Sequence, residues 1–159
     1  MPVNLLGDEL LDAQVQRAIM AASVGTDARE ECIAVARRIG GVDLDRWYDE
    51  WHRAGDLAMA HGDTLLAAHD SDGARRAFLW AATAYRTAGV MLYGMPVDAR
   101  LVAANRDQTN AFRRAAMLLP TPPAVVEIPY EDTTLPGYWF EPDTSDSAPA
   151  EGPVVVLIG

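Results

Sequence analysis

Apolar residues follow a helical period over most of the first 120 residues of the chain. They recur every three or four positions, which places them on one face of an amphipathic helix. This pattern predicts helices over residues 8–24, 27–39, 44–69, 74–92 and 97–119. Gly25 and Gly40 stand where the first two are expected to end, and Asp27 followed by Glu30 has the spacing of a capping box.

The two longest segments, residues 44–69 and 74–92, predict an antiparallel αα-hairpin with a turn at residues 70–73. Gly55 and Gly62 weaken the first helix by about 1 kcal/mol each relative to Ala, so we expect a kink or break near Gly62. The second helix interleaves small and aromatic residues, which lets a neighbouring helix approach closely. Its inner face is predicted to consist of Ala74, Ala77, Phe78, Ala81, Ala84, Tyr85 and Ala88.

The pattern changes near residue 120, where a proline-rich stretch ends the last helix. Residues 125–130 and 137–141 are rich in β-branched and aromatic side chains and predict the two strands of a hairpin. Residues 154–159 (VVVLIG) show no polar alternation, which is typical of a parallel strand covered on both faces. We therefore expect a helical domain over residues 1–120 and, over residues 121–159, the first strands of an α/β sheet that residues outside this chain complete.

Composition narrows the class of protein. The formal net charge of −10 disfavours nucleic acid and anionic membrane surfaces as partners. No stretch approaches the roughly 18 apolar residues of a membrane helix, and the first residues lack the basic start of a signal peptide. The single cysteine, Cys32, favours a reducing compartment, so we expect a cytoplasmic protein with Cys32 buried in a helix. All 13 basic residues are arginine, which excludes a catalytic lysine within the chain.

The histidines and aspartates that could bind a metal lack the spacing of a metal site. His52, His61 and His69 point in different directions on an ideal helix, so we expect no metal site there. We expect partly exposed positions at the surface, with a pocket-facing position for His52 or His61 as the alternative. Asp70 and Asp72 lack the remainder of a calcium-binding loop and suit a turn and a helix cap instead.

Three segments, taken in order, resemble one group of enzymes. They are residues 75–86 (RRAFLWAATAYR), residues 129–138 (PYEDTTLPGY) and residues 153–159 (PVVVLIG). Over about residues 44–159, the chain resembles the N-terminal part of α/β-hydrolases that carry a helical N-terminal domain. That group includes 2,6-dihydroxypseudooxynicotine hydrolase, fermentation–respiration switch esterase-like proteins and fungal polyketide chain-shortening hydrolases.

The resemblance implies a partial α/β-hydrolase fold in which the helical domain caps the active site. Gly159 would then start the loop that forms part of the oxyanion hole. The serine, acid and histidine of the family's triad follow this strand, and no Gly-x-Ser-x-Gly motif occurs here, so we expect no catalytic residue in this chain. Trp51, Trp80 and Tyr85 are candidates for lining an apolar substrate pocket. The resemblance implies no cofactor.

Two functional hypotheses remain. The first is a serine-type hydrolase that cleaves an ester or a carbon–carbon bond next to a carbonyl in a small molecule, such as an aromatic ketone or a polyketide. Its partner would be the C-terminal remainder of the hydrolase domain, from the same gene or on a companion chain, and a homodimer is a further expectation. The alternative is a noncatalytic helical interaction module, or a regulatory fragment that pairs with a hydrolase. The expected buried strand favours the first.

Overall fold

The computed structural model describes residues 4–22 and 28–141 of the 159-residue chain. The chain divides into two compact units, Met1–Leu119 and Pro120–Gly159. The described part of the first unit is helical and that of the second contains a β-hairpin, so each unit is described by itself. The assignment of residues 1–120 to a cap domain and residues 121–159 to a hydrolase domain stays a prediction.

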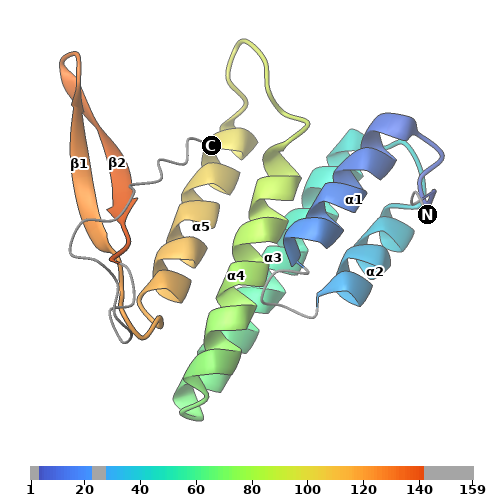
Figure 1. Ribbon diagram of the computed structural model, residues 1–159. Helices are drawn as coiled ribbons and strands as arrows, with labels where there is room; N and C mark the ends of the chain where they lie inside the picture. The colour runs from blue at the N-terminus through green and yellow to red at the C-terminus, as the bar shows by residue number, and fades with distance from the viewer. Residues whose placement is uncertain (1–3, 23–27, 142–159) are drawn as a thin grey trace. The chain divides into compact units, whose positions relative to one another are not determined.

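The described part of the first unit has five helices: α1 (Glu9–Ala22), α2 (Arg29–Ile39), α3 (Leu44–Ala67), α4 (Ser71–Gly89) and α5 (Ala99–Ala116). Each coincides with a helix that the periodicity predicts. The two longest, α3 and α4, form an antiparallel hairpin, and α5 packs along α4 (Figure 1). The shorter α1 contacts α2 and α4, and α2 also contacts α3. The central helix of this unit is therefore α4.

Aspartates begin the two longest helices. The Oδ1 atom of Asp43 accepts the N–H of Arg46 at 2.9 Å, and that of Asp70 accepts the N–H of Gly73 at 2.8 Å. Each carboxylate satisfies a backbone amide that has no partner inside the helix. Because Asp70 caps α4, the turn is shorter than expected and Ser71 already belongs to the helix.

The end of α2 agrees with the sequence prediction, whereas its start does not. The helix ends at Gly40, whose φ of 74° lies in the left-handed region that favours glycine. It begins after Ala28, which forms no side-chain cap, so the predicted start at a capping box is wrong in position. Asp27, the first residue of that box, lies outside the described residues.

Two glycines inside α3 make room for aromatic rings of α4. A Cβ atom at Gly55 would lie 2.6 Å from Cε1 of Tyr85, and one at Gly62 would overlap the ring of Phe78. The helix continues through both glycines, so a break near Gly62 is wrong. The propensity cost of about 1 kcal/mol per glycine is tolerated because each glycine lets a large ring pack against the α3 backbone.

The inner face of α4 is buried at every position that the sequence predicts for it. Trp47 and Trp51 of α3 are wholly buried, with their ring centroids 5.6 Å apart. The indole Nε1 of Trp47 donates to the carbonyl oxygen of Thr87 at 2.8 Å, so the ring's polar atom is satisfied by α4. Large α3 rings therefore pack against a face of α4 rich in small residues, and apolar side chains of α1 and α2 complete the core.

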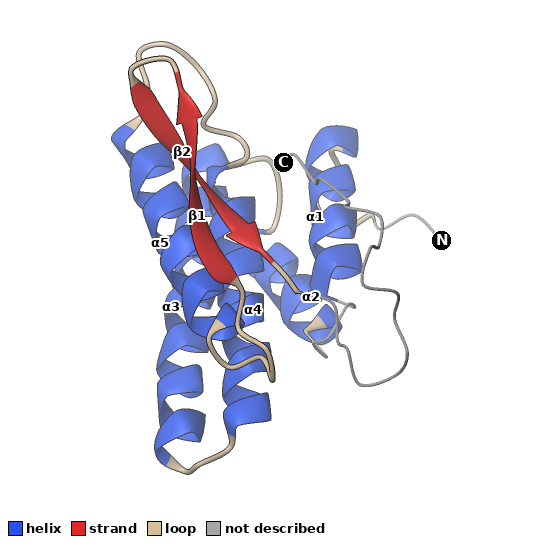
Figure 2. Cartoon of the chain, turned by 60° about the vertical axis from the view of Figure 1, so that its left-hand side comes forward, coloured by secondary structure: helices blue, strands red, loops and turns tan. Residues whose placement is uncertain are grey.

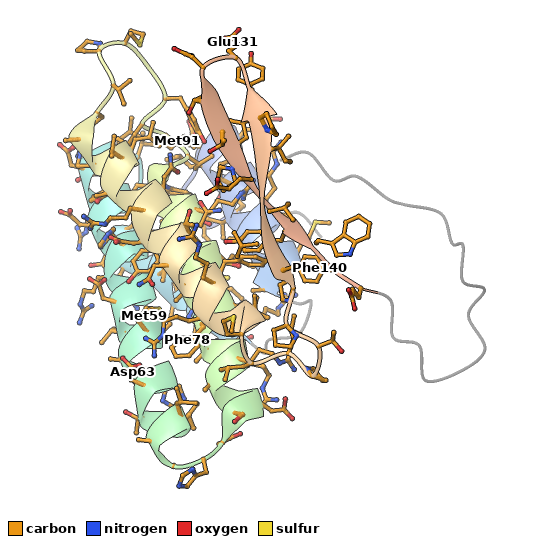
Figure 3. The ribbon with its side chains drawn as sticks, turned by 90° about the vertical axis from the view of Figure 1, so that its left-hand side faces the viewer. Met59, Asp63, Phe78, Met91, Glu131 and Phe140 are labelled. Carbon is orange, nitrogen blue, oxygen red and sulfur yellow. The ribbon has the colours of Figure 1, made fainter. Side chains whose placement is uncertain are left out.

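A second buried cluster surrounds Phe78. This ring is wholly buried, with Met59 of α3 packed against the cluster. The guanidinium of Arg114, on α5, lies 4.0 Å from the Phe78 ring centroid and forms an ion pair with Asp63 of α3. Figure 3 shows Met59, Asp63 and Phe78 in the same part of the bundle. The cation–π contact and the ion pair together join α3, α4 and α5.

The second unit contains a hairpin of β1 (Ala124–Tyr130) and β2 (Thr133–Trp139), shown in Figure 2. The strands are antiparallel, and Ile128 pairs with Leu135. Glu131 lies in the connecting turn with a φ of 51°. The predicted hairpin is confirmed, although β2 begins at Thr133 rather than at residue 137.

The predicted parallel strand at residues 154–159, including Gly159, lies outside the described residues. What the structure describes is mainly helical, with one two-stranded antiparallel sheet. The remainder of an α/β-hydrolase sheet stays a prediction. None of the described helices is long and apolar enough to cross a membrane.

Candidate functional site

A hollow of about 310 Å³ lies among α2, α3 and α4. Its lining residues are Ala28, Glu31, Ala58, His61, Leu65, Asp70, Gly73, Arg76, Ala77 and Trp80. Alanine, leucine and indole surfaces form its apolar part, and acidic, basic and imidazole side chains form its polar part. A hollow of this size and mixed lining can accept a small molecule that carries both apolar and polar groups.

The three residues that are candidates for lining a substrate pocket lie in two different places. Trp80 lines the hollow and exposes 8% of its surface. Trp51 is wholly buried, with its ring centroid 6.2 Å from that of Trp80 in an edge-to-face arrangement, so it supports the Trp80 ring from behind. Tyr85 is not among the lining residues and contacts Gly55 and His52. The structure therefore brings Trp51 and Trp80 together and leaves Tyr85 in a separate polar cluster.

That polar cluster is centred on His52. The Nε2 atom of His52 lies 3.2 Å from Oδ2 of Asp107 on α5, and its Nδ1 atom lies 3.4 Å from Oδ2 of Asp56 on α3. The hydroxyl of Tyr85, on α4, donates to Oδ1 of Asp56 at 2.8 Å. Three helices thus contribute to one cluster, in which His52–Asp107 and Tyr85–Asp56 are hydrogen bonds and His52–Asp56 is a close approach of an imidazole to a carboxylate.

Aromatic rings enclose the imidazole. The His52 ring centroid lies 5.3 Å from that of Tyr48 and 4.9 Å from that of Tyr85. The guanidinium of Arg100, near the start of α5, lies 5.4 Å from the Tyr48 ring centroid. The side chain of His52 is 22% exposed, which agrees with the partly exposed position that the sequence predicts.

The surroundings shift the pKa values of several members of this cluster. Burial raises the pKa of Tyr85, and its hydrogen bond to the Asp56 carboxylate raises it further. Burial, followed by the charge of Asp107, raises the pKa of Tyr48. Burial also acts to raise the pKa of Asp107, but hydrogen bonds from Arg106 and His52 outweigh it and hold this pKa below its ordinary value. Both phenols therefore stay neutral and the Asp107 carboxylate stays charged near neutral pH.

The remaining chemical candidates lie apart from the cluster. Cys32 is wholly buried as predicted, and burial raises the pKa of its thiol to about 12, which makes it a poor nucleophile in the folded protein. His61 lines the hollow, whereas His69 is exposed in the turn before α4. Within residues 4–22 and 28–141, no group of three or more His, Cys, Asp or Glu side chains is placed to hold a metal ion.

Sequence reasoning alone missed the His52 cluster. Tyr48, His52 and Asp56 recur at intervals of four, which places them along one face of α3, and this spacing was the available signal. The contribution of Asp107 carries no such signal, because it comes from another helix 55 positions away in the sequence.

No family model matches the chain. The chain is similar to 20-hydroxy-prefusarin hydrolase FUS2 of Gibberella moniliformis, with 34% identity over 130 residues, or 81% of this chain and 31% of that protein. It is 33% identical over 130 residues to hydrolase LUC6 of a Fusarium species, covering 81% of this chain and 31% of LUC6. It is 30% identical over 148 residues to alpha/beta hydrolase pydG of an Acremonium species, covering 92% of this chain and 34% of pydG.

These similarities confirm the resemblance to α/β-hydrolases that the sequence predicts. The chain spans about a third of the length of the curated relatives it matches.

Proposed function

We propose that this chain is the N-terminal part of a serine-type α/β-hydrolase. The complete enzyme acts on a small molecule and cleaves an ester or a carbon–carbon bond next to a carbonyl, with an aromatic ketone or a polyketide as the substrate class. The catalytic serine, acid and histidine lie on the C-terminal part of the hydrolase, outside this chain. The helical unit caps the active site.

One observation carries this proposal. Relatives whose names call them hydrolases share 30–34% identity with the chain, and the match covers most of the chain but only about a third of each relative. A chain that matches only a third of a hydrolase can lack the catalytic residues and still belong to a catalyst. The absence of a Gly-x-Ser-x-Gly motif from the sequence agrees with this division.

The hollow lined by Trp80 supports the role of the helical unit in substrate binding. Its wall combines the Trp80 indole with charged side chains, which suits a small molecule that carries both apolar and polar groups. Trp51 lies behind Trp80 and fixes the position of the ring. We propose Trp80 as the residue of the helical unit that contacts the substrate, with Trp51 positioning it.

The experiment uses the complete hydrolase, in which this chain is present with its C-terminal part. A fluorophosphonate probe should label one serine outside residues 1–159, and the label should be lost when that serine is replaced by alanine. If the complete protein binds no probe while this chain alone is a stable, soluble particle, the proposal is wrong and the interaction-module alternative gains support.

The role of Trp80 has a separate test in the same enzyme. Trp80→Phe should raise KM about tenfold and leave kcat nearly unchanged, since the ring contributes to binding in both the ground state and the transition state. His69→Ala, in an exposed turn, is the matched control and should change neither constant. Equal kinetics for Trp80→Phe and the wild type would remove the hollow from the proposal and leave the hydrolase assignment in place.

A further inference from the structure

The α3–α4 hairpin has two ends of opposite character. At one end, the turn at residues 68–72 (AHDSD) is polar. At the other end, α4 is followed by residues 90–97 (VMLYGMPV), which contain no charged side chain although the chain has a formal net charge of −10. This loop joins α4 to α5 and extends past the ends of both helices (Figure 1). Loops at a protein surface are ordinarily polar, so its composition indicates a contact surface.

A second segment adds to the apolar surface around this loop. Nη1 of Arg100 forms an ion pair with Oδ1 of Asp45 at 2.7 Å, which holds the start of α5 beside the start of α3. The same guanidinium binds Asp98, just after the loop, at 2.9 Å. The residues that precede α3 therefore lie at the same end of the helical bundle as the loop. The exposed apolar side chains of this end are Val42, Leu44, Tyr93, Met95 and Val97.

These five side chains, here called the apolar end, take no part in the features described above. None of them belongs to either buried cluster or lines the hollow beside Trp80. Single exposed apolar residues are ordinary, whereas several at one end form a patch, and tyrosine and methionine are enriched in protein–protein interfaces. Met95 is 89% exposed, more than any other large apolar side chain that the structure describes. The apolar end is therefore suited to a protein partner.

The lengths of the relatives indicate which partner fits. The chain covers about a third of the hydrolases it matches, so the proposed function places about two thirds of the complete hydrolase outside residues 1–159. A second copy of this chain fits less well, because two chains that each carry a net charge of −10 repel each other. We propose that the apolar end is a docking surface for the C-terminal part of the hydrolase. This inference rests on the proposed function.

The course of α5 explains what such a contact does. The helix starts at the apolar end and is 18 residues long, which separates its two ends by about 27 Å. Arg114, in its last turn, contacts Phe78 and Asp63 near the opposite end of the α3–α4 hairpin. The chain therefore leaves the helical unit far from the apolar end. A single covalent link can act as a hinge, and docking of the apolar end gives the helical unit a second point of attachment that fixes its orientation as a cap.

Methionine oxidation tests the docking. Dilute hydrogen peroxide converts an exposed methionine to its sulfoxide, and mass spectrometry of peptides measures the rate at each position. In this chain alone, Met95 should react at least as fast as Met20, which is 63% exposed on α1 and serves as the matched control. In the complete hydrolase, Met95 should react about tenfold more slowly than in this chain, while Met20 keeps its rate.

Three results would overturn the proposal. Equal rates for Met95 in this chain and in the complete hydrolase would show that the C-terminal part leaves the apolar end uncovered. Protection of Met95 in this chain alone would place the cover within residues 1–159 or on a second copy. Protection in the complete hydrolase that grows with protein concentration would assign the surface to self-association.

The oxidation rates do not depend on catalysis. They can therefore reject the docking surface while the fluorophosphonate probe still labels its serine, and that combination leaves the hydrolase assignment in place. Absence of the label would count against the hydrolase assignment itself, whatever the rate at Met95.

Discussion

The helical unit and the hairpin unit place similar apolar side chains in very different surroundings. In the helical unit, Trp47, Trp51 and Phe78 are wholly buried. In the hairpin, Val125 is 59% exposed, Ile128 51%, Tyr130 53%, Leu135 47% and Trp139 46%. Trp139 is therefore about half exposed although it is as large and apolar as the buried rings of the helical unit.

The difference follows from the number of layers in the described part of each unit. Packed helices enclose the space between them, whereas a two-stranded hairpin has two faces and nothing of its own to cover them. The helical unit thus has a core that can stabilise it without further chain. The exposed apolar residues of the hairpin are the part of this molecule best suited to pack against additional strands and helices, as the proposed function requires.

The largest expected effect comes from a matched pair of tryptophans. Trp51→Ala should lower the free energy of unfolding of the helical unit by about 3–5 kcal/mol, because it leaves a cavity in a closed core. Trp139→Ala should change the same quantity by less than about 0.5 kcal/mol. Urea denaturation followed by far-UV circular dichroism at 222 nm measures both. Equal losses in the two variants would show that the hairpin belongs to the same cooperative core.

The next effect tests how closely α3 and α4 approach. Gly62→Ala should destabilise the helical unit by about 1–3 kcal/mol, although alanine favours a helix by about 1 kcal/mol, because its methyl group overlaps the Phe78 ring. Thermal unfolding would show a lower Tm. Phe78→Leu in the same chain should make Gly62→Ala less harmful, and a double-mutant cycle measures this coupling. Additive effects would contradict the contact.

A third prediction concerns alkaline pH. The pKa of Tyr85 is raised in the folded protein, so the phenol ionises more readily when the chain unfolds. Stability should therefore fall as the pH rises above about 10, the ordinary pKa of tyrosine. Tyr85→Phe should reduce this fall while costing about 1 kcal/mol at pH 7 through loss of the hydrogen bond to Asp56. Tyr130→Phe, in the hairpin, is the control, and unfolding curves at pH 7 and pH 10.5 distinguish the two.

The smallest effect lies in the hairpin turn. Glu131 has a φ of 51°, which glycine adopts at lower cost, so Glu131→Gly removes backbone strain from the folded protein. Glycine also gives the unfolded chain more conformational freedom. The two effects oppose each other, so the net change in stability should stay below about 0.5 kcal/mol. Cα chemical shifts of β1 and β2 in an NMR spectrum would report whether the strands persist. A loss of the strand shifts would show that the Glu131 side chain holds the turn.

Features that depend on neighbours along the chain could be predicted from the sequence. The inner face of α4, the cap Asp70 and the hairpin of β1 and β2 all follow from local spacing and turn chemistry. Trp80 was a candidate for a pocket, and the structure places it on a hollow. Spacing along the sequence cannot show whether Tyr85 lines the same pocket, because the neighbours of its side chain depend on which helix packs against that part of α4.

The sequence by itself determined where the helices and strands form, since a helical period and a cap are properties of residues a few positions apart. Only the tertiary structure decided which side chains meet. When α3 is considered alone, Gly62 predicts a locally less stable helix. Once α4 lies beside α3, the missing side chain of Gly62 leaves the space in which the Phe78 ring packs. His52 is an ordinary polar residue of one helix until packing brings Asp107 of another helix to 3.2 Å. Contacts of this kind depend on the axial offset and rotation of packed helices, which no local pattern encodes.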